Sequence, residues 1–310
     1  ALVSDASAKT LSPEQQASTI LRETGIKGGV VSHIGCGDGR LTAALHANDS
    51  YLVHGLDRDE TKVDAARNRI ASMGLYGKVS VEAHKGKQLP YADNTINLIV
   101  ASADCNIPKA EMLRVLTPGG KVDFLDKRKT LHKPWPNDID EWTHFMYDAS
   151  GNGVSKDKRV RYPRHTQWHA GPRFARHHDA LASTSAMTSS KGRLFYIQDE
   201  GPISVLHRPA KWRLIARDGF NGKLLWKREI PNWMTHLYNF RAGPAEITRR
   251  LVSVGDHVYT TLGWRAPVTR LDAATGKTQL TYPGSVDAEE LVVHDGILLA
   301  VIGNPERHIE

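Results

Sequence analysis

The sequence predicts two domains of different fold class: a doubly wound α/β domain over residues 1–126 and an all-β part over residues 181–310, joined by residues 127–180. Three observations indicate this division. Strand-like apolar runs alternate with amphipathic helical stretches as far as about Asp126. Beyond it, helical patterns fade and short β-type runs take over. A turn pattern also occurs twice in the second half, which is typical of β-repeat architectures.

The α/β domain opens with a helix marked by a capping Ser12, a first-turn Pro13 and Gln15, whose side chain can reach back to the cap. We expect this helix to end near Gly25. The elements expected after it are strand 29–35, helix 40–47, strand 51–57, helix 60–73, strands 78–84 and 95–102, helix 108–116 and strand 121–126. Repeated strand–helix–strand units of this length predict parallel strands with right-handed crossovers.

A glycine-rich loop, HIGCGDGRL, follows the first strand and leads into the next helix. Gly35, Gly37 and Gly39 allow the backbone to turn sharply and approach a ligand closely, and the following helix offers its N-terminal N–H groups. The second strand ends in Asp57, where an acid can accept hydrogen bonds from both ribose hydroxyls. Together, the loop and the acid predict a site for a nucleotide-like cofactor.

The G-x-G-x-G spacing, the stretch QLPYADNTINLIV (88–100) and the stretch EMLRVLTPGGKV (111–122) resemble class I S-adenosylmethionine-dependent methyltransferases over about residues 25–126. The resemblance implies a Rossmann-like fold, S-adenosylmethionine as the cofactor, no metal, and direct methyl transfer to an acceptor that it does not identify. The cofactor contacts that it implies are His33, Gly35, Cys36, Gly37, Gly39, Asp57 and Lys85. Tyr91, Asp93 and Asp104 are the substrate-pocket positions.

Three residues depart from that family at polar positions. His33 stands where the family has an acid near the amino group of the methionine moiety, and Lys85 stands about where an acid meets the adenine amine. Asn97 replaces the usual Asp on the fourth strand. Because a cationic cofactor favours nearby carboxylates, two hypotheses about the function remain open. One is a methyltransferase that binds this cofactor; the other is a non-catalytic binding or assembly protein with a vestigial methyltransferase fold.

The second half contains β-type runs at 193–198, 212–218, 223–230, 257–263, 268–273, 291–295 and 297–303. RDGFNGKLLW (217–226) and LDAATGKTQL (271–280) share an Asp followed by Gly-Lys, a turn in which the Asp accepts backbone N–H groups and the glycine takes a positive φ. The D-x-x-x-G-K-x-x-W pattern resembles PQQ-type β-propellers, although Leu280 replaces the second tryptophan. The resemblance implies two to three blades of an incomplete propeller whose surface binds a protein partner.

Bound PQQ is not expected, because neither a complete propeller nor acids for a calcium ion are visible. A quinoprotein-type oxidoreductase is therefore the weakest of the three functional alternatives. The segment 165–179 is rich in His, Arg and Trp, but the adjacent His177, His178 and Asp179 would point to opposite faces of a strand. A metal site is thus not expected there. Cys105, just after the fourth strand, is either a nucleophile or a small buried residue.

Composition and charge limit the classes of binding partner that we expect. The 310 residues include 41 basic and 34 acidic side chains, a formal net charge of +7, with the two signs interspersed. Nucleic-acid binding is therefore not expected. No window reaches the ~18 apolar residues of a membrane helix. The start at Ala1 favours a mature exported protein, periplasmic in a bacterium, while trimming of the sequence explains it equally well and a cytoplasmic location stays open.

Overall fold

The computed structural model describes residues 11–102, 105–126, 129–163, 165–171, 183–203, 205, 207–234 and 247–303. The chain divides into two compact units, Ala1–Trp135 and Pro136–Glu310, which are described in turn.

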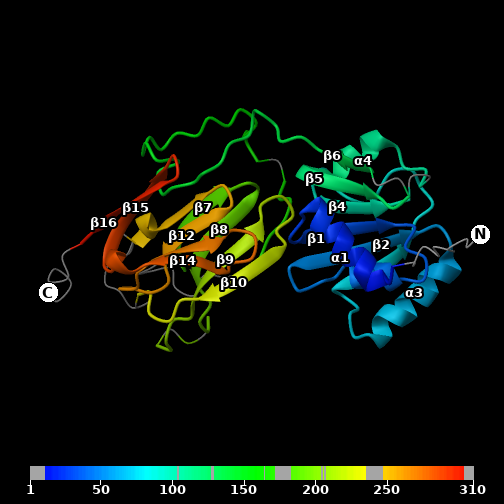
Figure 1. The fold of residues 1–310 in the computed structure, drawn as a ribbon, viewed down its shortest axis with the longest axis horizontal. Helices are drawn as coiled ribbons and strands as arrows, with labels where there is room; N and C mark the ends of the chain where they lie inside the picture. The colour runs from blue at the N-terminus through cyan, green and yellow to red at the C-terminus, as the bar shows by residue number, and fades with distance from the viewer. Residues whose placement is uncertain are drawn as a thin grey trace, which may run out of the picture. The chain divides into compact units, whose positions relative to one another are not determined.

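The first unit is built on a six-stranded sheet in the order β3-β2-β1-β4-β5-β6 (Figure 1). Its strands are β1 (Gly29–Ile34), β2 (Tyr51–Asp57), β3 (Val79–Ala83), β4 (Ile96–Ala101), β5 (Leu116–Phe124) and β6 (Lys129–His132). Strands β1 to β5 are parallel to their neighbours, and β6 is antiparallel to β5. The strand order reverses between β1 and β4, which is where open α/β sheets bind ligands at their carboxyl ends. The expected doubly wound fold is confirmed.

The helices of this unit are α1 (Pro13–Thr24), α2 (Arg40–Ala44), α3 (Glu60–Ser72) and α4 (Lys109–Val115). The predicted capping box is present: Gln15 donates its N–H to Ser12 Oγ at 3.3 Å, and Ser12 donates its own to Gln15 Oε1 at 3.1 Å. Gly25 ends α1 with φ 69°, a left-handed conformation that glycine adopts without strain. Helix α2 ends three residues before the predicted position 47.

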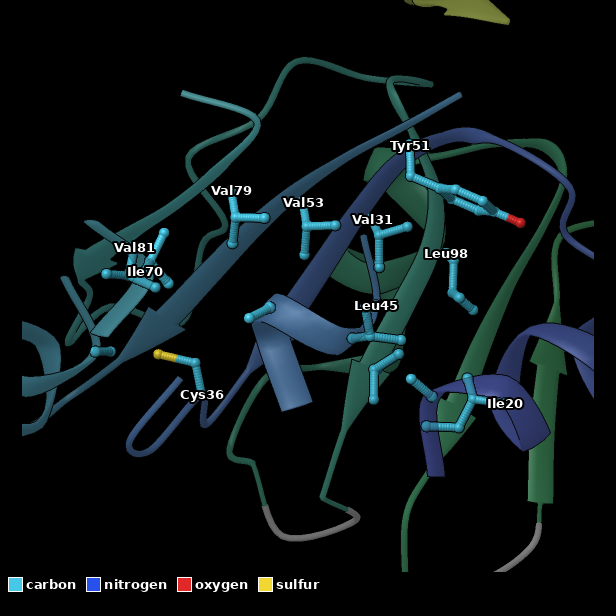
Figure 2. Packing of buried hydrophobic residues seen from close by; sticks show 14 of the residues in the cluster. Ile20, Val31, Cys36, Leu45, Tyr51, Val53, Ile70, Val79, Val81 and Leu98 are labelled. Atoms are coloured by element: carbon cyan, nitrogen blue, oxygen red, sulfur yellow. The ribbon is translucent and has the colours of Figure 1, made fainter. Parts of the chain in front are cut away.

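Apolar side chains cover both faces of the sheet. On one face Ala17 and Ile20 of α1 and Ile70 of α3 pack against alternate residues of β1, β2, β3 and β4, as Figure 2 shows for Ile20, Ile70, Val31, Val53, Val79 and Leu98. On the other face Met112 and Val115 of α4 pack against Ile34, Leu56 and Ile99. The central strands β1, β2 and β4 therefore contribute to both apolar clusters, as expected for a parallel sheet buried on both sides.

The first domain extends beyond its predicted end at residue 126, because strand β6 belongs to its sheet. The segment after Asp126 was expected to be a linker, but Lys129–His132 pairs antiparallel with β5. The first unit consequently extends to Trp135. Two prolines follow this strand closely and its four residues carry no sustained period, so the local sequence did not mark it as part of the sheet.

The second unit contains two four-stranded antiparallel sheets, in the orders β10-β9-β8-β7 and β11-β12-β13-β14, and a two-stranded sheet of β15 and β16. The strands are β7 (Thr184–Ser190), β8 (Arg193–Asp199), β9 (Trp212–Asp218), β10 (Leu224–Glu229), β11 (Leu251–Val254), β12 (His257–Thr261), β13 (Val268–Asp272), β14 (Thr278–Tyr282), β15 (Ala288–His294) and β16 (Ile297–Ile302). Two short 3₁₀ helices, η1 (Ile247–Arg250) and η2 (Pro283–Ser285), complete the described elements. The described part of this unit is thus all-β in its regular structure apart from these two turns.

The two sequence repeats form the same turn between their last two strands. Asp218 Oδ1 accepts the N–H groups of residues 220 and 221, and Asp272 Oδ1 accepts those of residues 274 and 275, at 2.9 to 3.1 Å. Gly222 and Gly276 have φ values of 74° and 68°. The turn chemistry predicted from the Asp-to-Gly-Lys spacing is confirmed.

A tryptophan packs on the glycine of each of these turns. A Cβ added to Gly276 would lie 2.6 Å from the Trp226 ring, and one added to Gly222 would lie 2.5 Å from the Trp168 ring. The indole N–H groups donate to equivalent carbonyls, Trp226 to Ala273 and Trp168 to Gly219, each at 3.0 Å. The repeat pattern in the sequence identifies Trp226. Trp168 makes the same contact but lies in an irregular segment, so the repeat pattern does not identify it.

Candidate cofactor site

The glycine loop connects the carboxyl end of β1 to α2 at the switch point of the sheet. Gly35, Gly37 and Gly39 have φ values of 81°, 55° and 79°, where side chains other than glycine are strained. A Cβ on Gly39 would lie 2.9 Å from Cβ of Ala66, so this glycine lets the loop pack on α3. A Cβ on Gly35 or Gly37 would meet no atom within 4 Å. The loop therefore presents bare backbone to open space at these two positions.

Asp57, at the carboxyl end of β2, is hydrogen-bonded to this loop. Its Oδ2 accepts the Gly37 N–H at 2.9 Å, and its Oδ1 accepts the Asp59 N–H at 3.0 Å. The loop is also held to β2 by the Gly35 N–H, which donates to the Leu56 carbonyl at 2.7 Å. A carboxylate offers about four lone-pair sites, so Asp57 retains acceptor capacity for a ligand. Sequence reasoning paired this acid with the loop, and the structure brings the two together.

His33 is buried beneath the loop, with 3% of its surface exposed. Its Nδ1 lies 2.8 Å from Thr42 Oγ1 on α2. Burial lowers the pKa of His33 to about 4, against a smaller opposing effect of the Asp57 charge. This histidine is therefore neutral at physiological pH, so it adds no positive charge beside a cationic ligand.

Lys85 follows β3 and is paired with an acid that the sequence reasoning did not single out. Its Nζ lies 2.8 Å from Glu60 Oε1, the first residue of α3, and both side chains are exposed. The hydrogen bond and the charge of Glu60 raise the pKa of Lys85. The cation that departs from the family pattern thus has a carboxylate beside it. Glu60 stands three residues after Asp57, and its first-turn position on α3 was the available signal.

Asn97 lies near the amino end of the sheet, away from the loop. Its Oδ1 accepts the N–H of Val30, at the start of β1, at 2.8 Å. A Cβ on Gly29 would overlap the Asn97 side chain. Because ligands of such sheets bind at the carboxyl ends, the replacement of Asp by Asn here concerns the start of β1 rather than the candidate site.

The three predicted substrate-pocket residues have different surroundings. Tyr91 Oη lies 3.0 Å from Ser32 Oγ and 2.9 Å from His54 Nδ1, on the α4 side of the sheet, and burial raises its pKa. Asp93 forms an ion pair with Arg114 at 2.6 Å. Asp104 lies outside the described residues. Tyr91 and Asp93 thus each interact with other side chains of this unit.

Both cysteines are free, and Cys36 lacks the surroundings of an activated nucleophile. Cys36 lies in the apolar cluster shown in Figure 2, and burial, with the nearby negative charge of Asp57, raises its pKa to about 12. It is therefore a thiol rather than a thiolate at neutral pH. Cys105 packs at the edge of the other cluster of the same sheet.

The remaining candidates from the sequence fall in the second unit. His177, His178 and Asp179 lie outside the described residues. Within the described ranges, no group of three or more His, Cys, Asp or Glu side chains is arranged to hold a metal ion. No helix of the described chain has the length and hydropathy needed to cross a bilayer.

Residues 31–120 match the family model of the methyltransferase domain. Methyltransferase GfsG of Streptomyces halstedii is 33% identical over 102 residues, which are 31% of this chain and 37% of that protein. Ubiquinone/menaquinone biosynthesis C-methyltransferase UbiE of Klebsiella pneumoniae is 27% identical over 139 residues, or 42% of this chain and 55% of that protein. The chain thus spans about half or less of the length of these two relatives.

Among solved structures, geranyl diphosphate C-methyltransferase from Streptomyces coelicolor A3(2) aligns with 18% identity and a TM-score of 0.32, over 34% of this chain and 43% of that one. The family match covers the strand β1, the glycine loop, Asp57 and the strands as far as β5. The N-terminal part of this chain thus has a Rossmann-like fold of the methyltransferase type, and its residues 31–120 are similar to methyltransferase domains.

Proposed function

We propose that the first unit binds S-adenosylmethionine at the glycine loop and Asp57 and that it serves a methyl-transfer reaction. The observation that carries the proposal is the hydrogen bond from Gly37 N to Asp57 Oδ2, which holds the loop and the acid together beside the open space at Gly35 and Gly37. The match of residues 31–120 to the methyltransferase-domain model supports the choice of cofactor.

The residues present fit this cofactor. Asp57 supplies acceptors for ribose hydroxyls, and the backbone of Gly35 and Gly37 is accessible to the methionine part. His33 and Lys85 depart from the methyltransferase pattern, but they disfavour a cationic cofactor less than their residue types indicate. His33 is neutral, and Lys85 is paired with Glu60. When bound, S-adenosylmethionine supplies a methyl group activated by its sulfonium.

The contribution of this chain to such a reaction is binding and orientation. Asp57 and the glycine loop would fix the nucleoside and methionine ends, so that the methyl group faces one direction at the carboxyl edge of the sheet. Cys36 is excluded as a base that accepts a proton from the acceptor, because it is buried and its pKa is raised to about 12.

Calorimetric titration with S-adenosylmethionine and S-adenosylhomocysteine tests the proposal. We expect micromolar binding to the wild type. Asp57→Asn keeps the size of the side chain but removes its charge and one acceptor, and should weaken binding about tenfold to a hundredfold, the worth of a hydrogen bond to a charged group. Asp64→Asn is the matched control, an exposed acid on α3 paired with Arg67, and should leave affinity unchanged. Absence of heat up to millimolar ligand would overturn the proposal.

A non-catalytic binding module is the second candidate, and His33 is the observation that favours it. A buried neutral imidazole bonded to Thr42 stands where the family has a carboxylate, so one favourable interaction with the cofactor's ammonium group is missing. The two candidates differ in turnover. Binding of S-adenosylmethionine without formation of S-adenosylhomocysteine in the presence of varied acceptors would support the module.

For the second unit we propose a set of PQQ-like propeller blades that serves as a scaffold or as a surface for a protein partner. The repeated contact of a tryptophan with the glycine of a turn supports this: Trp226 of β10 packs on the turn of the next sheet, and Trp168 packs in the same manner on the turn between β9 and β10. The four-strand meanders β7–β10 and β11–β14 are also of the size of propeller blades.

A further inference from the structure

A short segment of the second unit contacts the first strand of each of its three described sheets. The Trp142 carbonyl accepts the N–H of Ser189 on β7 at 2.7 Å, and the Thr143 carbonyl accepts that of Ser253 on β11 at 2.9 Å. His144 Nε2 accepts the N–H of Val293 on β15 at 3.0 Å. Three consecutive residues thus supply acceptors to three different sheets.

The three donors occupy the same position of the repeat. Each lies four residues before the next strand: Ser189 before Arg193, Ser253 before His257, and Val293 before Ile297. Strands β7, β11 and β15 are each at an edge of their sheet, so none of the described strands pairs with these N–H groups on that side. Because a buried backbone donor without a partner is costly, the segment stabilises all three edges.

The last of the three contacts differs from the others in its chemistry. The Val293 N–H can only donate, so His144 Nε2 must carry a lone pair, which leaves the proton of a neutral ring on Nδ1. Thr143 Oγ1 lies 2.8 Å from that Nδ1. A proton added to Nε2 would place two donors face to face and break the bond to β15, whereas the carbonyls of Trp142 and Thr143 do not titrate.

We propose that residues 142–144 form a strap that holds three successive β-sheets in register, and that its His144 end is a latch that opens when the imidazole is protonated. A cavity of about 230 Å³ borders His144. The charged groups that face it are Asp148 from the following turn, Arg249 from η1 and Glu290 from β15, with His294 next to Val293. Arg249 and Glu290 pair with each other at 3.1 Å.

The direction of the effect follows from burial. His144 is 6% exposed, and desolvation lowers its pKa from 6.5, while Asp148 raises it and His294 lowers it further. The closed latch therefore favours the neutral ring. It is fully stable above pH 6.5 and loses stability as the pH falls below that value, by up to tenfold in the opening equilibrium per pH unit.

Amide hydrogen exchange of the whole protein, expressed as protection factors, tests the latch. Between pH 7.5 and pH 5.5 we expect the protection of Val293 to fall by up to about tenfold, while Ser189 and Ser253 serve as internal references and keep theirs. His144→Gln retains an acceptor that does not titrate in this range and should make Val293 protection independent of pH. His144→Phe removes the acceptor and should lower Val293 protection at both pH values.

Equal protection of Val293 at both pH values in the wild type would overturn the proposal. So would a pH dependence that persists in His144→Gln. If the variants fail to fold, the NMR titration of His144 in the wild type decides the matter, because a pKa at or above 6.5 is incompatible with a neutral latch.

Discussion

His33 stands at a position where the sequence departs from the methyltransferase resemblance, and its environment leads to a measurable prediction. Because the pKa is about 4 in the folded chain and about 6.5 when unfolded, the fold favours the neutral ring. Stability should be complete above pH 6.5 and fall as the pH approaches 4. Between pH 7 and pH 5 the free energy of unfolding should decrease by about 2 kcal/mol on account of this group.

Urea unfolding of the wild type and of His33→Asn at both pH values measures this contribution. Asparagine has an amide oxygen near the position of Nδ1 and can still bond to Thr42, but it does not titrate. The free energy of unfolding of the wild type, minus that of His33→Asn, should therefore be about 2 kcal/mol lower at pH 5 than at pH 7. A difference that does not change with pH would contradict a buried neutral histidine.

At the scale of elements, the contact between Trp226 of β10 and the turn at Gly276 joins two sheets. Trp226→Ala removes a buried ring and its hydrogen bond to the Ala273 carbonyl, and should cost about 3–5 kcal/mol. Leu280→Ala is the matched control at the same repeat position, where the side chain is 42% exposed and should cost less than about 0.5 kcal/mol. Chemical denaturation followed by tryptophan fluorescence compares the two. Equal losses would show that the tryptophan contact does not join the sheets.

Elements with a local signal were predictable, and those that depend on distant contacts were not. The capping box at Ser12, the glycine loop and the turns at Asp218 and Asp272 are specified by residues a few positions apart. The pairing of β6, the place of Asn97 at the amino end of β1 and the partner of Lys85 depend on tertiary packing. The strap joins His144 to Val293, which are 149 positions apart, and no periodicity marks such a contact.

At the scale of the whole molecule, each unit has apolar clusters of its own. Those of the first unit consist of residues before position 132, and those of the second consist of residues after position 185. A substitution in one core, such as Trp226→Ala, is therefore expected to leave the affinity of the other unit for its ligand unchanged, since the described clusters of the two units share no residue.

Differential scanning calorimetry with S-adenosylhomocysteine tests whether the two units unfold independently. A ligand at a hundred times its Kd stabilises the unit that binds it by about 2.7 kcal/mol and does not act on a unit that it does not touch. We expect two transitions in the wild type, of which ligand raises one and Trp226→Ala lowers the other. In Asp57→Asn the ligand-dependent shift should shrink while both transitions remain. A single transition that ligand and Trp226→Ala move together would mean that the two cores unfold as one cooperative structure, and binding at the glycine loop would then report on the strap and the β-sheets as well.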